Sequence, residues 1–574
     1  MQKIITIRET QNPDILNDTN LHPILKRIYL KRNIKDKIEI DNQFKHLLHY
    51  QDLSDINIAV ERLYIALEKK ENILIVGDYD VDGATSTALL VKTLKNFGAT
   101  NINFFVPDRF KYGYGLSKEI IFAVKDSFKP TLIITVDNGI TSSMGVACAN
   151  ENNINVIITD HHLPGNTLPD AIAIINPNKP KDNFKSKNIA GVGVAFYLML
   201  ALRAKLRTQN WFNKNNIAEY SLLNVLDLVA LGTVSDMVVL DHNNRILVHN
   251  GMRHIRANNC CFGIKALLDK KDISATKITD LTFIVAPRLN AAGRLEDMAL
   301  GIYCLLADDL PTAKKLAQQL QKLNTQRRKL EEQMQKEAEH YLENYKFAND
   351  KLPLGLCLHN ENWHQGIIGI LASRIKEQTH SPVIAFANHD DEFIKGSARS
   401  IEKVHIRDVL AKIDAENPTL IEKFGGHAMA AGLTLRAKNY SSFNNLFIKE
   451  IKNILTSADL HETIITDGAL NANELTSDLI NILQGAGPWG NGFPEPIFCG
   501  NFYILDQRII GQKHLKLTLE YQDKIFDAIY FKCDLKLWPN FRITEAQIAY
   551  IPDENEYLNQ KKIQLIVKHI VPLI

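Results

Sequence analysis

The chain has 574 residues, a formal net charge of +2 and seven cysteines. Domains hold about 100 to 200 residues, so this length predicts about three or four of them. A nearly neutral charge does not by itself indicate a nucleic-acid partner, and any basic groove must be local. The cysteines form no C-x-x-C pair, which argues against a structural zinc site and favours reduced thiols. The sequence contains neither a signal-peptide pattern nor a long apolar segment, so we expect a cytoplasmic protein.

The N-terminal segment, residues 1–50, is expected to be a lead-in that packs on the first domain. Residues 21–33 are basic and helix-like, and polar residues surround them. The sequence assigns no function to this segment.

A repeated unit of apolar strand, acidic or polar turn and helical stretch follows. Such alternation predicts a doubly wound, parallel α/β sheet. Four of the five expected strands are followed within two residues by an aspartate, which chance placement would not favour. The strands are 73–76, 102–106, 132–136, 156–159 and 172–175, and the aspartates are Asp78, Asp108, Asp137 and Asp160.

The first strand ends in three alternate aspartates, Asp78, Asp80 and Asp82. Carboxylates this close repel one another unless a cation holds them ionised. The sequence D-x-D-x-D-G also matches the start of an EF-hand loop. That reading fails because Leu89 stands where an EF-hand needs a bidentate Glu, and because a strand precedes the loop instead of a helix. A purely structural acidic turn is the remaining alternative for this stretch alone.

Two further polar clusters end the third and fourth strands. One contains Asp137, and the other is Asp160-His-His162. A histidine pair after a strand is by itself more often a hydrogen-bonded loop than a ligand set. Because neighbouring parallel strands end at the same edge, we expect five side chains to converge there: Asp78, Asp80, Asp137, His161 and His162. Oxygen and nitrogen ligands without thiolate suit two ions of Mn²⁺ or Mg²⁺, the arrangement that hydrolyses phosphoesters.

The rest of the chain changes pattern three times. An apolar run at 222–234 closes on Asp236, and residues 300–345 read as one long helix that packs against a domain. A second α/β pattern at 353–455 has expected strands at 354–358 and 383–387. After residue 496, short alternating strands predict a small antiparallel barrel, with examples at 502–505, 515–519 and 563–567.

Several motifs resemble, in the same order, those of the DHH phosphoesterase superfamily. They are Asp78-Tyr-Asp-Val-Asp-Gly83, Asp137-Asn-Gly139, Asp160-His-His162 and Leu231-Gly-Thr-Val-Ser-Asp236. Further sequence motifs are similar to those of the RecJ exonuclease family. They include Ala286-Pro-Arg-Leu-Asn-Ala-Ala-Gly-Arg294 and the DHHA1-type Gly425-Gly-His-Ala-Met-Ala-Ala-Gly432. The resemblance covers nearly the whole chain from about residue 20.

The resemblance implies a domain order and an activity. The expected parts are a DHH catalytic domain (51–300), a connecting helix (301–350), a smaller α/β DHHA1 substrate-binding domain (351–456) and an oligonucleotide-binding barrel, or OB fold (457–574). The implied activity is metal-dependent exonuclease cleavage of single-stranded DNA from the 5′ end, in DNA repair and recombination. Implied partners are single-stranded DNA, a single-strand-binding protein and a helicase.

Carried over residue by residue, the resemblance also implies a site. The metal ligands would be Asp78, Asp80, Asp82, Asp137, His161, His162 and Asp236. Whether Asp82 or Asp227 contacts metal stays open. We prefer Asp236 to Asp227, because nine residues separate the two and one helix would point them in opposite directions. The catalytic residues would be Asp137, His161 and His427.

Residues for DNA come from three regions. The resemblance implies a pocket for the 5′ phosphate, formed by Arg109, Arg288, Ser397 and Arg399. It also implies a glycine-rich turn, formed by Gly425, Gly426 and His427, with His427 near the scissile phosphate. On the barrel, Lys513, His514 and Lys516 supply charge, and Phe502, Tyr503 and Phe531 are candidate stacking platforms.

Two alternatives remain beside this reading. One is a hydrolase of short oligoribonucleotides, cyclic dinucleotides or polyphosphate, whose enzymes generally lack the long connector and the barrel. The other is a catalytically inactive DNA-binding scaffold, which would not need metal-binding residue types at all four motifs. The preferred metal, RNA tolerance, oligomeric state and protein partners are not predicted.

Overall fold

The computed structural model describes residues 4–10, 15–16, 19–349, 352–460, 463–557 and 560–573. The chain divides into two compact units, which are described separately. One unit comprises residues 9–324 and 481–496, and the other comprises 1–8, 325–480 and 497–574. None of the helices in the described ranges combines the length and the apolar character that crossing a bilayer requires.

The first unit is built on a sheet of five parallel strands in the order β3-β2-β4-β5-β6. Every residue of β2 and β4 is buried, which is why both strands read as nearly continuous apolar runs, with Thr135 the one polar residue. The predicted doubly wound fold is therefore confirmed. The strands are β2 (Ile73–Gly77), β3 (Ile102–Phe105), β4 (Leu132–Val136), β5 (Asn155–Thr159) and β6 (Ala173–Ile175).

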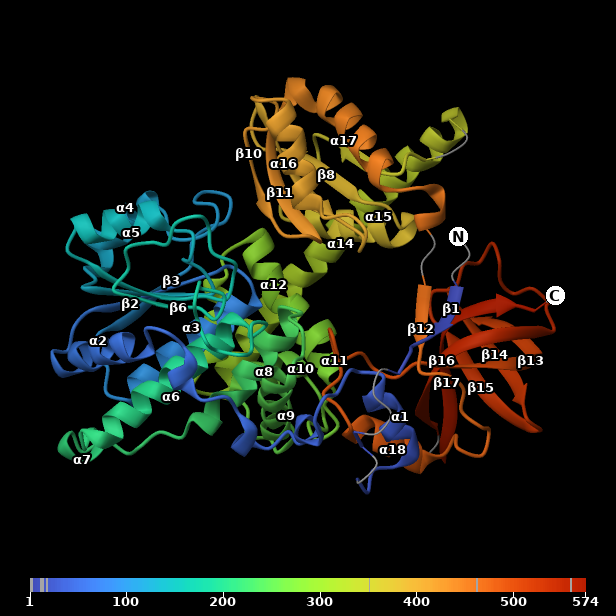
Figure 1. Ribbon diagram of the computed structural model, residues 1–574, viewed down its shortest axis with the longest axis horizontal. Coiled ribbons are helices and arrows are strands. Elements are labelled where there is room, and N and C mark those ends of the chain that lie inside the picture. Colours follow the sequence, from blue (N-terminus) through green and yellow to red (C-terminus); the bar gives the residue numbers. More distant parts are fainter. Residues whose placement is uncertain are drawn as a thin grey trace. The chain divides into compact units, whose positions relative to one another are not determined.

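Helices cover both faces of this sheet (Figure 1). Helices α4 (Lys118–Phe128) and α5 (Ser143–Glu151) bury their apolar side chains against one face. The opposite face carries α2 (Ile56–Glu68), α3 (Val81–Asn96) and α6 (Gly191–Thr208).

The strand order places a topological switch point between β2 and β4. The chain leaves β2 through α3 toward β3 on one side, and leaves β4 through α5 toward β5 on the other. Ligands of open α/β sheets bind in the crevice outside such a point. Asp78 and Asp137 follow these two strands directly.

A helical layer completes the unit. The predicted single helix at 300–345 is in fact two helices, because Asp309 caps a new one: its Oδ1 accepts from the Thr312 N–H at 2.7 Å, and Pro311 stands in the first turn. The helices are α7 (Trp211–Lys214), α8 (Leu226–Ser235), α9 (His242–Arg256), α10 (Phe262–Leu268), α11 (Ile278–Asp280), a π-helical turn at Leu281–Val285, α12 (Ala286–Leu295), α13 (Ala299–Leu306) and the start of α14 (Leu310–Asn349). From Thr325 on, α14 belongs to the second unit.

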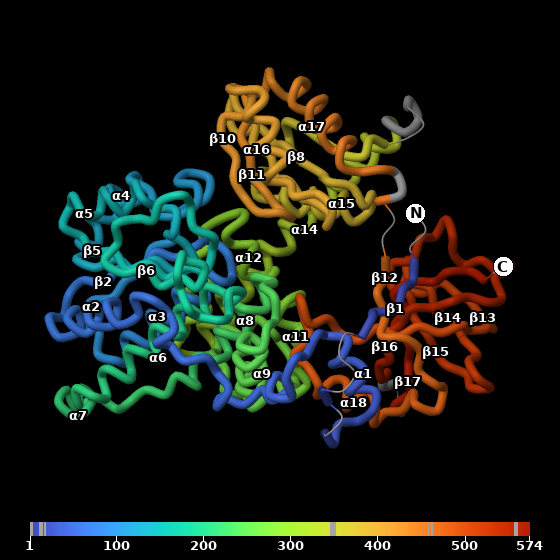
Figure 2. The backbone as a smooth tube through the Cα atoms, in the orientation of Figure 1, coloured from blue at the N-terminus to red at the C-terminus, as the bar shows by residue number. Residues whose placement is uncertain are grey.

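The N-terminal segment contributes to both units. Helix α1 (Pro23–Leu30) lies against residues 481–496 of the first unit, where the Tyr29 hydroxyl donates to the Ala486 carbonyl at 2.8 Å. The whole segment was expected on the first domain, but β1 (Ile4–Ile7) pairs in parallel with β12 (Thr463–Thr466) in the second unit (Figure 2). A four-residue strand depends on such a distant partner for its hydrogen bonds, so local sequence does not locate it.

The second unit contains a mixed sheet of order β10-β11-β9-β8-β7, parallel only between β7 and β8. Apolar residues of α16 and α17 cover one face, and α15 packs on β8 and β9. The elements are β7 (Leu356–His359), α15 (Ile368–Thr379), β8 (Val383–Asn388), β9 (Phe393–Arg399), α16 (Ile406–Glu416), β10 (Lys423–Gly426), β11 (Ala430–Arg436) and α17 (Tyr440–Ile454).

The same unit contains a closed barrel of order β13-β14-β15-β17-β16. The prediction of a barrel is confirmed, but not that of a purely antiparallel one, because β15 and β17 are parallel. A closed ring with an odd number of strands cannot alternate direction throughout. The barrel strands are β13 (Phe498–Ile510), β14 (His514–Tyr521), β15 (Lys524–Tyr530), β16 (Glu545–Tyr557) and β17 (Gln560–Pro572). Before them, α18 (Ser477–Gly485) begins in this unit and continues into the 481–496 segment of the first unit.

Candidate metal centre

The turn from β2 into α3 holds the first two aspartates in place. Asp80 is the N-cap of α3, and its Oδ1 accepts from the Gly83 N–H at 3.1 Å. A Cβ on Gly83 would lie 2.5 Å from the Asp78 carbonyl oxygen. The helix therefore starts directly against the strand end, and this keeps Asp78 and Asp80 beside each other at the sheet edge.

Asp137 lies at the end of β4 in a left-handed backbone conformation, with φ of 61°. A non-glycine residue in this region stores strain that the surroundings must balance. Its N–H donates to the Thr159 carbonyl at 3.0 Å, and a Cβ on Gly191 would lie 2.8 Å from the Asp137 side chain. The start of α6 thus presses on Asp137 from the other side of the crevice.

Asp160 orients both histidines that follow it. Its Oδ1 accepts from the backbone N–H groups of His161 and His162, at 2.7 and 3.0 Å, and lies 2.7 Å from His162 Nδ1. Its Oδ2 accepts from the Ile140 N–H at 2.8 Å. Burial alone would raise the pKa of Asp160, but the hydrogen bond and the charge of His162 hold that pKa below its usual range. The same contact raises the pKa of His162 to about 9 against the opposing effect of burial.

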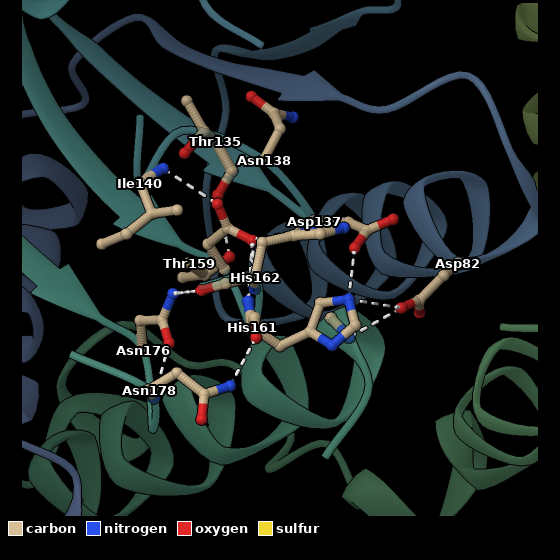
Figure 3. Close-up of polar contacts among 12 residues, drawn as sticks. Asp82, Thr135, Asp137, Asn138, Ile140, Thr159, His161, His162, Asn176 and Asn178 are labelled. Atoms are coloured by element: carbon tan, nitrogen blue, oxygen red, sulfur yellow. Dashed lines mark hydrogen bonds and ion pairs between the residues drawn. The ribbon is translucent and has the colours of Figure 1, made fainter. Parts of the chain in front are cut away.

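The His161 ring lies between the carboxylates of Asp137 and Asp82 in Figure 3. Its Nε2 is 3.1 Å from Asp137 Oδ1, 3.5 Å from Asp236 Oδ2 and 3.9 Å from Asp82 Oδ2. Asp82 also accepts from the N–H groups of Gly191 and Val192, at 2.7 and 2.9 Å. Asp82 therefore joins the first turns of α3 and α6 and faces His161 as well.

Within the described residues, three sets of side chains bring possible ligand atoms within 4.8 Å of one another. Asp137 belongs to two of them and so does His161, so the sets form one continuous cluster. The sets are Asp78, Asp80 and Asp137; Asp137, His161 and His162; and Asp82, His161 and Asp236.

The carboxyl groups of this cluster have raised pKa values because they are buried close to one another. Burial, followed by the charge of Asp80, raises the pKa of Asp78 to about 8 and that of Asp82 to about 7. Burial and the charges of Asp82 and Asp80 hold the pKa values of Asp137 and Asp236 well above their usual range. Groups that resist ionisation together are stabilised as carboxylates by a nearby cation. The chemistry of the donor set therefore fits divalent metal ions.

Asp227 and Asp108 lie outside the cluster. Asp227, at the start of α8, is buried, and its Oδ2 accepts from the Cys261 N–H at 2.7 Å. Asp236 caps the opposite end of the same helix and faces His161. Asp108 accepts from the Phe110 N–H at 2.8 Å in a local turn. The helix geometry thus separates Asp227 from Asp236, in the sense that the spacing predicted.

Comparisons with known proteins give the chain a family. The family described as "DHH family, N-terminal domain" matches residues 72–233, the DHHA1 domain matches 345–455 and the "RecJ OB domain" matches 466–569. The chain is 48% identical to the single-stranded-DNA-specific exonuclease RecJ of Escherichia coli, over 96% of both chains. It is 44% identical to that of Haemophilus influenzae over the full length of both. The chain belongs to the RecJ family. The resemblance predicted from its motifs is confirmed.

The RecJ fold extends to solved structures. RecJ of Thermus thermophilus in complex with Mn²⁺ matches with a TM-score of 0.81 at 26% identity, covering 100% of this chain and 80% of that one. The Mg²⁺ complex of the same protein matches with a TM-score of 0.75 at 25% identity, covering 99% and 78%. The predicted fold, with DHH, DHHA1 and barrel domains, is therefore confirmed.

Two arginines that the RecJ resemblance singled out lie in the first unit. The Arg109 guanidinium stacks over the Tyr79 ring at 4.5 Å, and its charge acts on Asp78. Arg288, on α12, donates to the Leu267 carbonyl at the end of α10. Arg109 therefore borders the cluster directly, whereas Arg288 is partly engaged in holding two helices together.

The other residues that the RecJ resemblance predicts to bind substrate lie on the sheet of the second unit. Ser397 and Arg399 are on β9, where Arg399 Nη1 donates to the Ser397 hydroxyl at 3.1 Å. Ser397 pairs with Gly432 of β11, which in turn pairs with Gly425 of β10. A Cβ on Gly425 would meet nothing within 4 Å, so the backbone here is open to a close-approaching ligand.

The turn from β10 to β11 depends on glycine as well. Gly426 has a φ of +144°, and a Cβ there would lie 2.4 Å from the Ala430 carbonyl oxygen. The next residue, His427, donates its N–H to that same carbonyl at 2.8 Å. The turn thus fixes the backbone of His427 beside the glycine pair.

The barrel residues divide by strand alternation. Phe502 is 1% exposed and packs on Tyr521 and Tyr550 in the barrel core. The prediction that it is a stacking platform is therefore wrong. Tyr503, the next residue, is 55% exposed, and Phe531 is 50% exposed. Of the predicted basic residues, Lys516 lies 3.5 Å from Asp527, and His514 packs edge-on against the Phe531 ring. Which of Phe502 and Tyr503 is buried depends on the register of β13, which the sequence alone does not give.

Sequence reasoning missed the residues that hold the histidines. Asp160 was left out of the candidate set although it directly precedes them. The Asn178 side chain donates to the His161 carbonyl at 2.6 Å, the Asn176 side chain donates to that of His162 at 2.9 Å, and the Tyr114 hydroxyl lies 3.0 Å from His162 Nδ1. Only adjacency could have signalled Asp160, and nothing local signals the other three.

Proposed function

We propose that this chain is a metal-dependent exonuclease that hydrolyses phosphodiester bonds of single-stranded DNA from the 5′ end. One observation carries the proposal. A continuous cluster of five carboxylates and two imidazoles lies at the switch point of a chain that is 48% identical to a single-stranded-DNA-specific exonuclease. Proteins this similar over their full length generally keep the reaction when the reactive side chains are present.

The assigned ligands are the members of the three sets. Asp78, Asp80, Asp137, His161 and His162 would hold one or both of two ions, with Asp236 and Asp82 at the far side of His161. Mn²⁺ or Mg²⁺ suits the oxygen-rich donor set. Such ions, when bound, supply Lewis acidity toward the phosphoryl oxygens and the attacking water.

The chain's own residues supply orientation. Asp160 accepts from both histidine backbones and from His162 Nδ1, which leaves Nε2 of His162 for a ligand. Asp137 and His161 are the central members of the cluster, because each belongs to two ligand sets. Removing either should therefore disturb both metal positions together.

Each unit offers side chains suited to DNA. Arg109 beside the cluster and the Ser397–Arg399 pair on β9 are suited to phosphate, since guanidinium groups bind phosphate bidentately. Arg288 and His427 complete the proposed set, with His427 as a catalytic residue and the open backbone of Gly425 two residues before it. Exposed Tyr503 and Phe531 on the barrel offer faces on which bases can stack.

The cellular setting is part of the same proposal. We place the enzyme in the cytoplasm, acting in DNA repair and recombination. Its partners there would be a helicase that separates the strands and a single-strand-binding protein that covers the substrate.

The test uses 5′- and 3′-labelled single-stranded DNA, duplex DNA and RNA, each incubated with Mn²⁺, Mg²⁺ or chelator. The expected result is release of label from the 5′ end of single-stranded DNA with either metal and none with chelator. Degradation from the 3′ end would overturn the polarity. Binding without hydrolysis would instead support an inactive scaffold.

A further inference from the structure

The first unit contains a polar pocket beside the C-terminal half of α3, whereas Asp82 of the metal cluster is in the first turn of that helix. Its volume is about 520 Å³, within the range of small-ligand sites. The second half of α3, the segment before α8, the α9–α10 connection and the end of α13 form its walls. Asp82 and the pocket residue Lys92 are ten positions apart on α3, which corresponds to about 15 Å along the helix. The pocket is therefore separate from the proposed catalytic site.

Positive charge is in excess in the lining of this pocket. Lys92 and Lys95 come from α3 and Lys265 from α10, against a single lining acid, the exposed Asp308. Within residues 19–349, none of the three ammonium groups lies within 4.0 Å of a carboxylate oxygen. Buried Asp227 lies behind the wall, where Lys92 lowers its pKa against the larger raising effect of burial. Three such cations in a concave site favour a phosphate group.

Neutral polar groups complete the lining. The side chains of Asn224, Asn258 and Asn259 form no hydrogen bond to any residue of the described stretch 19–349. The Tyr220 hydroxyl is buried and likewise lacks a hydrogen-bond partner in that stretch. The three asparagine amides therefore offer donors and acceptors to a ligand in the pocket.

One wall is suited to a flat ring. The Phe262 side chain is 37% exposed at the pocket, and Lys265 Nζ lies 5.5 Å from the centre of that ring. Beside it, burial raises the pKa of the Cys260 thiol to about 12 and that of Cys261 well above its usual value, so both thiols are neutral. The pocket thus combines cations, amides and an apolar, aromatic wall.

We propose that this pocket binds a mononucleotide-sized phosphate monoester, with the phosphate at Lys92, Lys95 and Lys265 and the base against Phe262. The asparagine amides match the donors and acceptors of a base edge. Inorganic phosphate would satisfy only the lysines, and a nucleoside only the amides and the ring. A nucleotide satisfies both parts of the site.

The experiment measures binding of 5′-dAMP to the full chain by isothermal titration calorimetry in the presence of chelator, so that no turnover is needed. Deoxyadenosine and inorganic phosphate are titrated in parallel. The pocket variant is Lys95→Gln/Lys265→Gln, and the matched control is Lys118→Gln/Lys185→Gln, which removes two exposed lysines outside the pocket. A third variant, Phe262→Ala, removes only the ring, and circular dichroism checks the fold of each.

The expected result is saturable dAMP binding that weakens about tenfold or more in the pocket variant and is unchanged in the control. Phe262→Ala should weaken dAMP but not phosphate, and dAMP should bind more tightly than phosphate or deoxyadenosine. Equal dAMP affinity in the pocket and control variants would overturn the site, as would a lack of any saturable binding. Phosphate binding as tight as dAMP would overturn the nucleotide assignment. Because no hydrolysis is measured, failure here leaves the proposed exonuclease activity untouched.

Discussion

Asp160 determines how both histidines of the cluster point, although it is not itself assigned as a ligand. Its two carboxylate oxygens accept from three backbone N–H groups and the His162 ring. A carboxylate that orients a metal-binding imidazole generally affects metal affinity almost as strongly as a ligand does. Its place in the cluster is therefore testable apart from the ligands.

Asp160→Asn should weaken Mn²⁺ binding by about 10- to 100-fold, because an amide nitrogen would face N–H donors in place of one carboxylate oxygen. Calorimetric titration of Mn²⁺ measures this, and thermal unfolding separates it from loss of fold. Asp126→Asn, at an exposed position on α4, is the control. Wild-type affinity in Asp160→Asn would remove Asp160 from any positioning role.

Arg399 is the second residue whose role is decided by one substitution. Its guanidinium donates to the Ser397 hydroxyl and to the Ala398 carbonyl, which fixes its position on β9. Arg399→Ala should weaken binding of 5′-phosphorylated single strands by about 1.5 to 3 kcal/mol, the strength of charge-assisted hydrogen bonds. Strands with a 5′ hydroxyl should lose less.

Fluorescence anisotropy with both kinds of strand measures the difference, and Arg407→Ala, on the exposed side of α16, removes the same charge elsewhere. An equal loss on both strands would show that Arg399 does not read the terminal phosphate.

At the scale of elements, one ion pair fastens the sheet of the first unit beneath the site. Glu71, just before β2, lies 2.6 Å from Arg62 of α2 and accepts from the Thr131 hydroxyl, just before β4, at 2.8 Å. Arg62 Nε in turn donates to Asn155 of β5 at 2.7 Å. Burial would raise the pKa of Glu71, but the hydrogen bonds from Arg62 and Thr131 outweigh it and lower that pKa below its ordinary 4.5.

Glu71→Gln should therefore destabilise the protein by about 1 to 2 kcal/mol at pH 7. A lowered carboxyl pKa contributes stability that is complete above the unfolded value of 4.5 and is lost as pH falls through the folded value. The difference between wild type and variant should shrink below about pH 4.5. Urea unfolding at several pH values measures it, with the exposed Glu151→Gln as control. A difference that stays constant with pH would contradict this account.

How far the sequence predicts these elements depends on how local their stabilising contacts are. Strands β2 and β4 are predicted to within a residue, because burial on both faces leaves a nearly continuous apolar run ending in Asp78 or Asp137. The parallel contact of β15 with β17 and the burial of Phe502 follow from barrel closure and register, which single strands do not encode. The convergence of the cluster was predictable from parallel strand ends, but the hydrogen bonds of Asn176 and Asn178, just after β6, to the histidine carbonyls depend on loop geometry that the strand pattern does not encode.

At the scale of the whole molecule, the barrel is proposed to lengthen the DNA contact. The structure shows where the barrel can be cut from the chain. Residues 481–496 belong with the first unit, where Phe493 stacks on Tyr29 and Arg245 lies over the Phe493 ring. A truncation after Pro496 keeps these contacts. The domain limits predicted from sequence remain a proposal, which limited proteolysis would test.

The truncation after Pro496 should weaken binding to long single strands and shorten each processive run, while cleavage of short oligonucleotides persists. Tyr503→Ala/Phe531→Ala keeps the barrel and should reproduce part of the loss, about 1 to 3 kcal/mol for each stacked base. Gel-shift and single-turnover assays on strands of several lengths measure both effects. Unchanged affinity and run length in both variants would assign the barrel another role.

The central claim is that the cluster around Asp137 binds the ions that hydrolyse DNA, and Mn²⁺ titration tests it most directly. Calorimetry on wild type should give about two ions per chain. Asp137→Asn keeps the shape of the side chain but removes the charge that two ligand sets share, so it should lose most Mn²⁺ affinity together with hydrolysis of single-stranded DNA. Asp108→Asn, at another strand end outside the cluster, should keep both. Wild-type Mn²⁺ binding and full hydrolysis in Asp137→Asn would contradict the account.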